Sequence, residues 1–296
     1  RAVAGTLLLV FLLGDGCASE VPGFDAQRAF EDLVRQTEFG PRVPGTAAHR
    51  ACADWLHERL ADLADSAWRQ PFMGRLHGVA DSVPMINLVG RFRPQKERRV
   101  LLGAHWDTRP FADLDPDSAA RTASFAGAND GASGIAVLLE IARALQATPP
   151  PVGVDLAFFD GEDAGAYGET TGLWIQGSRY FAAHLPADYA WVIVVDMVGD
   201  RDLRLLREGH SLRLAPDLVD RVWNTARRIG ETAFLDYRGE NIIDDHLPFL
   251  MRGIPAVDII DFDFPYWHTT ADTPDNCAPA SLGSVGRVLL QMVYSE

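Results

Sequence analysis

The chain has 296 residues, of which 47% are hydrophobic and 23% are charged, and its formal net charge is −14. This is an ordinary globular composition, and the length suits one large α/β domain or two small ones. A nucleic-acid-binding protein needs a basic stripe and this sequence shows none, so the composition argues against a nucleic-acid partner. An acidic surface suits a cationic substrate such as a free peptide amino terminus, although many soluble proteins are acidic for solubility alone.

Residues 1–20 differ from the rest of the chain and are typical of an export signal. A positive first residue precedes the apolar run 7–13, and small residues and Cys17 follow it. The apolar run is too short to span a membrane stably. The arrangement predicts a signal peptide followed by one domain over residues 21–296. Cys17 also fits a bacterial lipoprotein with a lipid at that cysteine. We therefore expect an exported protein, either periplasmic or held at the membrane through this anchor alone.

The three cysteines, Cys17, Cys52 and Cys277, show no C-x-x-C spacing. A zinc site built from thiolates is therefore not expected. If Cys17 carries a lipid, Cys52 and Cys277 are left. They either pair in an oxidising compartment or stay as two separately buried thiols.

Strands and helices alternate through most of the chain. Apolar runs and alternation predict strands at 67–73, 85–93, 100–104, 152–159, 191–195 and 256–260. Helical periodicity predicts helices at 24–38, from Thr46 to about Leu60, and at 135–145, 176–184, 216–229 and 280–293. A helical turn is expected after Asp244-Asp245-His246. The alternation predicts an α/β fold with a central, mostly parallel mixed sheet flanked by helices on both faces.

The apolar run 152–159 is the stretch around which the rest is organised, because it leads through Gly161 into two adjacent carboxylates, Glu162 and Asp163. In open α/β sheets, ligands bind beyond the carboxyl ends of the strands. Two neighbouring carboxylates repel each other unless a cation or a shared proton relieves the repulsion. The pair is therefore either a solvated acidic turn or a metal ligand with a general base beside it.

Other strand ends carry similar side chains. His105 and Asp196 each follow an apolar strand, Asp130 stands in a Gly-rich loop that begins a helix, and His268 follows the last strand. Each residue alone has an ordinary alternative, as a surface or core residue or a helix cap. Parallel strands bring their carboxyl ends to one edge, however, and imidazole with carboxylate is a catalytic zinc ligand set. An additional carboxylate there can act as general base.

The motifs that contain these residues resemble, in combination and order, those of the zinc-dependent aminopeptidase superfamily. They are His105-Trp106-Asp107, Asn129-Asp130-Gly131-Ala132-Ser133-Gly134, Phe158-Phe159-Asp160-Gly161-Glu162-Asp163, Asp196-Met197-Val198-Gly199 and Trp267-His268-Thr269. The resemblance runs from about Phe39 to the C-terminal helix and implies a zinc-aminopeptidase-like catalytic domain. Within the superfamily the chain most resembles the glutaminyl cyclases, especially the bacterial ones.

Two motifs favour a cyclase over an aminopeptidase. They are Asp244-Asp245-His246-Leu247-Pro248-Phe249-Leu250, followed by Arg252-Gly253-Ile254-Pro255, and Phe264-Pro265-Tyr266-Trp267-His268-Thr269. Cyclases of this family keep a Trp before the metal-binding His. By this likeness Trp267, Trp174 and Phe264 wall the pocket for the substrate's Gln side chain, with core packing as the alternative.

The resemblance also implies the zinc ligands and the acid/base. By this likeness Asp130, Asp163 and His268 bind one Zn²⁺ ion. Glu162 is the general acid/base that moves protons during the reaction. Eukaryotic members usually have Glu where Asp163 stands, whereas bacterial-type members accept Asp.

A hydrogen-bonded acidic chain is implied behind Glu162. Its members by likeness are Asp196 and Asp244, with Asp245 as the alternative to Asp244. In two-zinc aminopeptidases, the residues at His105 and Asp196 hold a second metal. The resemblance therefore implies one zinc ion and leaves a second ion at His105 open.

The implied activity is that of a glutaminyl-peptide cyclotransferase, which converts an N-terminal Gln of a peptide or protein to pyroglutamate and releases ammonia. The alternative enzyme is a two-zinc aminopeptidase that hydrolyses N-terminal residues. A third possibility is a catalytically inactive domain that binds partners. The complete set Glu162, Asp130, Asp163 and His268 argues against it, since an inactive domain needs no such set.

Overall fold

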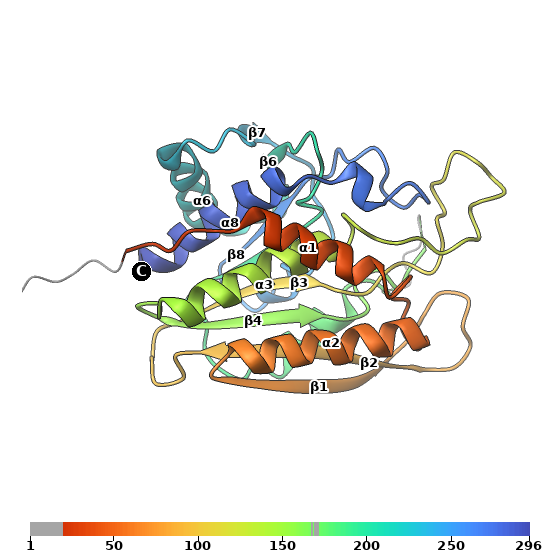
Figure 1. Ribbon diagram of the computed structural model, residues 1–296, viewed down its shortest axis with the longest axis horizontal. Coiled ribbons are helices and arrows are strands. Elements are labelled where there is room, and N and C mark those ends of the chain that lie inside the picture. The colour runs from red at the N-terminus through yellow and green to blue at the C-terminus, as the bar shows by residue number, and fades with distance from the viewer. Residues whose placement is uncertain (1–19, 167, 169–171) are drawn as a thin grey trace, which may run out of the picture.

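A six-stranded mixed sheet forms the centre of the computed structural model, which describes residues 20–166, 168 and 172–296 (Figure 1). In spatial order its strands are β1 (Ser66–Gly74), β2 (Val83–Phe92), β4 (Gly153–Phe159), β3 (Arg99–His105), β5 (Val192–Asp196) and β8 (Ala256–Ile260). Strands β4, β3, β5 and β8 are parallel, whereas β1 and β2 run antiparallel at one edge. The predicted leader and Cys17 lie outside the described residues.

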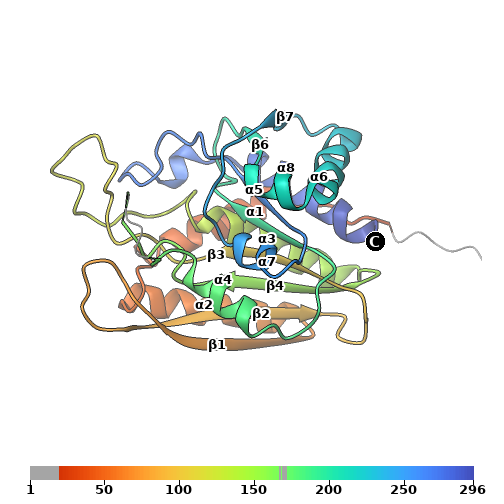
Figure 2. The same cartoon turned by 180° about the vertical axis from the view of Figure 1, so that it is seen from behind.

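Helices cover both faces of the sheet. One face carries α1 (Ala26–Thr37), α2 (Ala47–Leu63), α3 (Ala132–Ala147) and α8 (Pro279–Tyr294), with α6 (Pro216–Ile229) packed on α8 (Figure 1). The other face carries the short helices α4 (Gln176–Ala183), α5 (Gly209–Leu214) and α7 (Leu247–Leu250) (Figure 2). The predicted α/β class, with a mostly parallel sheet between helices, is confirmed.

The strand order reverses around β3, and this reversal places the site. From β3 the chain crosses through α3 on one face to reach β4, and from β4 it crosses through α4 on the other face to reach β5. The connections therefore diverge from a crevice beyond the carboxyl ends of β4, β3 and β5. In doubly wound sheets this switch point is where ligands bind.

Four short elements are absent from the sequence-based expectations. They are β6 (Leu205–Arg207), α5, β7 (Phe234–Arg238) and the 3₁₀ turn η1 (Pro274–Asn276). Strands β6 and β7 form a separate two-stranded sheet, and neither is long enough to show a clear alternation of apolar residues.

The core is apolar and continuous across the sheet. Strands β3, β4, β5 and β8 are buried along their whole length, and α3 is buried on nearly all sides because α1 and α8 cover it. Cys52 and Cys277 are both buried and free, so the alternative of two separate thiols is confirmed. Among the described helices, none combines the length and apolar character needed to cross a membrane.

Helix α3 begins at Ala132, three residues before the predicted start, because the glycine-rich segment is already helical. Gly134 lies where the first turn of α3 meets the sheet. A Cβ at this position would lie 2.4 Å from the carbonyl oxygen of Val195 and 2.9 Å from the Cβ of Ala104. The absence of a side chain therefore lets the helix approach β3 and β5 closely enough to aim its N-terminus at the crevice.

This contact predicts that Gly134→Ala lowers the free energy of unfolding by about 1–3 kcal/mol, as overpacking does in a filled core. Helix propensity alone favours alanine by about 1 kcal/mol, so a loss of stability would come from the close contact of residue 134 with β3 and β5. Thermal unfolding measures the change. Gly23→Ala is the control, because a Cβ at Gly23 meets no atom within 4 Å. An unchanged or higher melting temperature for Gly134→Ala would contradict the packing.

Candidate metal centre and active site

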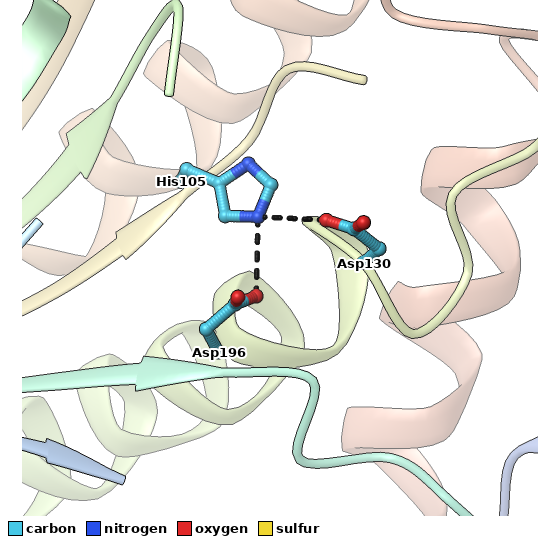
Figure 3. Close-up of side chains that lie close together, drawn as sticks. All are labelled: His105, Asp130 and Asp196. Atoms are coloured by element: carbon cyan, nitrogen blue, oxygen red, sulfur yellow. Dashed lines mark hydrogen bonds and ion pairs between the residues drawn. The ribbon is translucent and has the colours of Figure 1, made fainter. Parts of the chain in front are cut away.

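The side chains predicted from the strand ends meet in one cavity at the carboxyl edge of the sheet. The predicted residues in its lining are Asp130, Glu162, Asp163, Trp174, Asp196, Asp244, Trp267 and His268. His105 lies directly behind it, at the end of β3, with its imidazole against Asp130 and Asp196 (Figure 3). The carboxylates and imidazoles of this group are almost entirely buried, so their charges must be balanced locally.

Asp130 stands between the two histidines. Its Oδ1 lies 3.1 Å from His105 Nε2, and its Oδ2 lies 3.4 Å from His268 Nε2. Burial opposes the charge of Asp130, but the neighbouring imidazoles of His105 and His268 hold the pKa of this carboxyl well below its usual range. The carboxylate thus joins two clusters, His105–Asp130–Asp196 and Asp130–Asp163–His268.

The Asp130–Asp163–His268 cluster has the spacing of a metal site. Zinc binds imidazole nitrogen and carboxylate oxygen at about 2.0–2.2 Å, so two ligand atoms of a tetrahedral site lie about 3.4 Å apart. His268 Nε2 lies 3.4 Å from Asp130 Oδ2 and 3.5 Å from Asp163 Oδ2. Both of these carboxylate oxygens are buried and accept no hydrogen bond. Donor types, spacing and unpartnered oxygens all fit a zinc ion with three protein ligands.

The His105–Asp130–Asp196 cluster is more tightly closed. His105 Nε2 lies 3.1 Å from both Asp130 Oδ1 and Asp196 Oδ1, which is hydrogen-bond distance and shorter than the edge of a zinc tetrahedron (Figure 3). Burial works against protonation, yet the Asp196 charge and hydrogen bonds to Asp107, Asp130 and Asp196 raise the pKa of His105 well above its usual range. The imidazole of His105 therefore lies between these two carboxylates at hydrogen-bond distance from both.

The turn that carries Glu162 and Asp163 is fixed by Asp107, two residues beyond the end of β3. The Asp107 carboxylate accepts hydrogen bonds from the backbone N–H groups of Glu162 (3.1 Å) and Asp163 (3.3 Å). Asp107 stands in the motif His105-Trp106-Asp107, but no role was predicted for it. Its contacts show that the end of β3 fixes the backbone of the candidate acid/base, Glu162, and of one candidate ligand, Asp163.

Arg109 orients Asp163, and sequence reasoning did not identify it. Its fully buried guanidinium donates to Asp163 Oδ1 at 2.7 Å and to both carboxylate oxygens of Asp113. It also lies over the ring of Trp174, with its central carbon 4.8 Å from the ring centroid. Because Arg109 uses one oxygen of Asp163, the other oxygen is left facing His268.

The loop before α3 is held by Asp272. Its carboxylate accepts hydrogen bonds from the backbone N–H groups of Asn129 (2.7 Å) and Asp130 (3.1 Å). Gly131 follows with φ +95°, and a Cβ there would lie 2.6 Å from the carbonyl oxygen of Asp107. A residue with a side chain could not bring Asp130 this close to the end of β3.

Backbone strain is concentrated around the cavity. In the described part of the chain, four residues other than glycine have a left-handed backbone, and three of them are Ile175, Met197 and His268. Met197 follows Asp196, His268 is itself a candidate ligand, and the Ile175 N–H donates to the carbonyl of Glu162. Such conformations cost about 1–3 kcal/mol each and persist where surrounding contacts hold a functional geometry.

Glu162 lies in the cavity with carboxylates on several sides. Burial raises its pKa most strongly. His105 opposes this, and the charges of Asp163, Asp244 and Asp245 add to it, so the pKa of Glu162 stands well above its usual range. A buried carboxyl with a raised pKa suits a group that takes up and releases a proton near neutral pH.

The predicted acidic chain lies around Glu162. Asp196 and Asp244 both line the cavity with Glu162, whereas Asp245 is fully buried outside the lining. Burial, partly offset by His105, raises the pKa of Asp196 to about 7. Of the two alternatives in the sequence, Asp244 is therefore the carboxyl that faces the cavity.

A buried histidine stands behind Asp244. His246 Nε2 lies 3.2 Å from Glu208 Oε2, and its Nδ1 lies 3.6 Å from Asp258 Oδ2. Asp258 and Asp244 lie within 4.8 Å of His246 by their nearest ligand atoms. Burial, followed by the nearby charges of Asp244 and Glu208, raises the pKa of Asp258 well above its usual range. The acidic chain is thus continued into the interior by a histidine between carboxyl groups.

Aromatic side chains form the apolar wall of the cavity. The Trp267 ring lies 4.0 Å from the His268 ring and 4.8 Å from the Phe262 ring, measured between centroids. Trp174, which forms an isolated β-bridge with Asp163, lines the cavity as well. Phe264 is buried against the lining residues Met197, Ile242 and Ile260 but does not itself line the cavity, and Phe262 takes the wall position instead. The sequence signal for Phe262 was its place two residues beyond β8.

The contact between Arg109 and Asp163 predicts weaker zinc binding by Arg109→Lys. Lysine keeps the charge but cannot reach Asp163 and Asp113 together, so Asp163 loses its orientation. Loss of such a partner typically costs about 10–100-fold in metal affinity. Competition with a chromogenic chelator measures the zinc dissociation constant.

Arg91→Lys is the matched control for this substitution, because Arg91 makes a bidentate pair with Asp155 near the other end of β4. Its zinc affinity should stay that of the unmodified protein. Equal zinc affinity for Arg109→Lys and Arg91→Lys would show that Arg109 does not position a ligand.

Comparisons with known proteins place these features in context. The sequence signature of peptidase family M28 matches residues 87–293. The crystal structure of Tannerella forsythia glutaminyl cyclase is 39% identical, with a TM-score of 0.88 over 93% of this chain and 100% of that one. A Zn-dependent exopeptidase from Parabacteroides distasonis is 36% identical, with a TM-score of 0.90 over 94% of this chain and 100% of that one.

A more distant relative is the bovine glutaminyl-peptide cyclotransferase. It is 28% identical over 245 residues, which cover 69% of this chain and 64% of the bovine protein. The structures of a cyclase and of an exopeptidase are thus about equally similar to this chain. The geometry of the site must decide between the two activities.

Proposed function

The chain belongs to peptidase family M28, and we propose that within this family it is a glutaminyl-peptide cyclotransferase. Its substrates would be peptides and proteins with a free N-terminal Gln. The observation that carries the proposal is the contrast between the two clusters around Asp130. One has the spacing of a zinc site, and the other is closed to hydrogen-bond distance by His105.

Asp130, Asp163 and His268 would hold one zinc ion. Bound there, zinc supplies Lewis acidity to the γ-carboxamide oxygen of the substrate. Arg109 keeps Asp163 in place, and Asp272 keeps the backbone of Asp130 in place, so the protein preforms this set of ligands. The similar structure of a Zn-dependent exopeptidase supports the choice of metal.

The reaction itself requires little beyond positioning and proton transfer. The α-amine of the N-terminal Gln forms a bond to its own side-chain carbonyl carbon, the bond from that carbon to the amide nitrogen breaks, and ammonia leaves. Nucleophile and electrophile belong to one residue, so their proximity is already favourable. Glu162 takes the proton from the attacking amine and gives it to the leaving nitrogen.

Residues around Glu162 support that role. Asp196 and Asp244 line the cavity with it, and Asp107 fixes its backbone. Trp267 and Phe262 present ring surfaces beside the ligand His268, where they would confine the methylene groups of the Gln side chain and exclude water. An intramolecular amine needs no activated water, so a dry wall suits cyclisation better than hydrolysis.

A second candidate function is a two-zinc aminopeptidase. One observation favours it: each oxygen of Asp130 faces a different histidine, as a carboxylate that bridges two ions does. The second ion would lie between His105 and Asp196. The distances of 3.1 Å in that cluster would have to lengthen to admit an ion.

A Gln-initiated tripeptide amide distinguishes the two activities. We expect pyroglutamyl peptide and one equivalent of ammonia, both measured by mass spectrometry and an ammonia assay. Glu162→Gln should lower kcat by about 10²–10⁴-fold, the usual contribution of a general acid/base. Glu38→Gln, which removes a carboxylate from an exposed ion pair with Arg35, is the control and should keep full activity. Release of free glutamine would support the aminopeptidase, and full activity of Glu162→Gln would contradict the mechanism.

A further inference from the structure

A second cavity of about 240 Å³ lies directly beside the candidate active site. The two cavities share three lining side chains, Ile242, Ile260 and Phe262, which form the partition between them. Phe262 is only half-buried, with Trp267 packed near its ring on the side of the active site. The other residues around the second cavity are Arg204, Leu206, Glu208, Gly239, Glu240 and Asp263.

Two buried carboxylates build this cavity from three separate segments. Glu208 accepts hydrogen bonds from the backbone N–H groups of His210, Ser211 and Ile242, which ties the start of α5 to the partition. Asp261 accepts from the backbone N–H groups of Arg204 and Asp263, which ties the residue before β6 to the segment after β8. The walls are therefore held in place before anything binds.

The lining indicates the chemistry of an occupant. Leu206 and the three partition residues give an apolar interior. At the rim, the exposed side chains of Arg204 and Asp263 lie 3.6 Å apart, and Glu240 adds a further negative charge. With the Arg204–Asp263 pair counted as neutral, Glu240 at the rim and the buried Glu208 leave the lining acidic, which disfavours an anionic side chain. The apolar residues favour an apolar one.

We propose that the second cavity binds an apolar side chain at one of the two residues that follow the N-terminal Gln of the substrate. This inference rests on the proposed cyclotransferase activity and specifies the class of peptide that it prefers. An extended peptide advances about 3.3–3.6 Å per residue, so a chain whose first side chain occupies the catalytic cavity reaches a neighbouring one within one or two residues. The second cavity shares Ile242, Ile260 and Phe262 with the catalytic cavity, so it is the neighbouring cavity that such a peptide would reach.

The test is a peptide series, Gln-X-Ala-amide and Gln-Ala-X-amide, in which X is Gly, Leu or Asp. At one of the two positions we expect kcat/KM for Leu to exceed that for Gly by about tenfold, the effect of burying most of a leucine side chain. Asp at that position should be no better than Gly.

Leu206→Ala tests the assignment to this cavity, because Leu206 lines the second cavity and not the catalytic one. It should reduce the preference for Leu over Gly several-fold while leaving kcat/KM for the Gly peptide unchanged. Leu214→Ala, on the exposed side of α5, is the matched control and should keep the full preference. Thermal unfolding of both variants checks that they are folded.

Equal kcat/KM values for Leu and Gly at both positions, with pyroglutamate still formed, would overturn the role of the second cavity alone. A preference that Leu206→Ala leaves intact would do the same. If no peptide yields pyroglutamate, the proposed cyclotransferase activity fails, and this inference fails with it.

Discussion

The carboxylate of Asp130, placed between the imidazoles of His105 and His268, is the interaction on which the rest of the site depends. Several carboxyl groups are buried within a few ångströms of it, and buried like charges are costly unless each is compensated. The protein compensates them in different ways. Arg109 pairs with Asp163, the imidazole of His105 lies between Asp130 and Asp196, and two oxygens stay open beside His268. A cation at those oxygens completes the balance.

The fold makes this arrangement possible because it brings separate strand ends together. Strands β3, β4 and β5 end side by side, and α3 packs against β3 and β5 so closely that only glycine fits at residue 134. The positions of the site residues are fixed further by buried side chains that hydrogen-bond to the backbone and do not contact the substrate. Asp107 and Asp272 each accept two backbone hydrogen bonds, and Met197 and His268 have strained, left-handed backbones at the same site.

Much of this could be predicted from the sequence because apolar strands followed by polar residues are a local pattern. The parallel sheet, and the convergence of Asp130, Glu162, Asp163 and His268 at its edge, follow from that pattern alone. Arg109 could not be found in this way. A single arginine after a strand usually reaches solvent, and its burial here depends on Asp163 and Trp174, which lie more than fifty residues further along the chain.

The aromatic wall of the cavity also could not be predicted fully from the sequence, although its residues are close together in the chain. Phe262 and Phe264 alternate with aspartates after β8, and sequence similarity pointed to Phe264. The bend of this segment is set by Asp261, whose carboxylate accepts from the backbone of Asp263 and Arg204. In this segment Phe262 lines the cavity and Phe264 does not. The contact between Asp261 and Arg204 joins positions far apart in the chain, so the sequence alone does not show which aromatic ring lies at the cavity.

The claim that one cluster holds an ion while the other is closed by the imidazole of His105 is tested most directly by X-ray diffraction. Crystals grown with excess zinc would be measured on both sides of the zinc absorption edge. The account predicts one anomalous peak, between Asp130 Oδ2, Asp163 Oδ2 and His268 Nε2, with His105 Nε2 still at hydrogen-bond distance from Asp196. A second peak of similar height between His105 and Asp196 would contradict it.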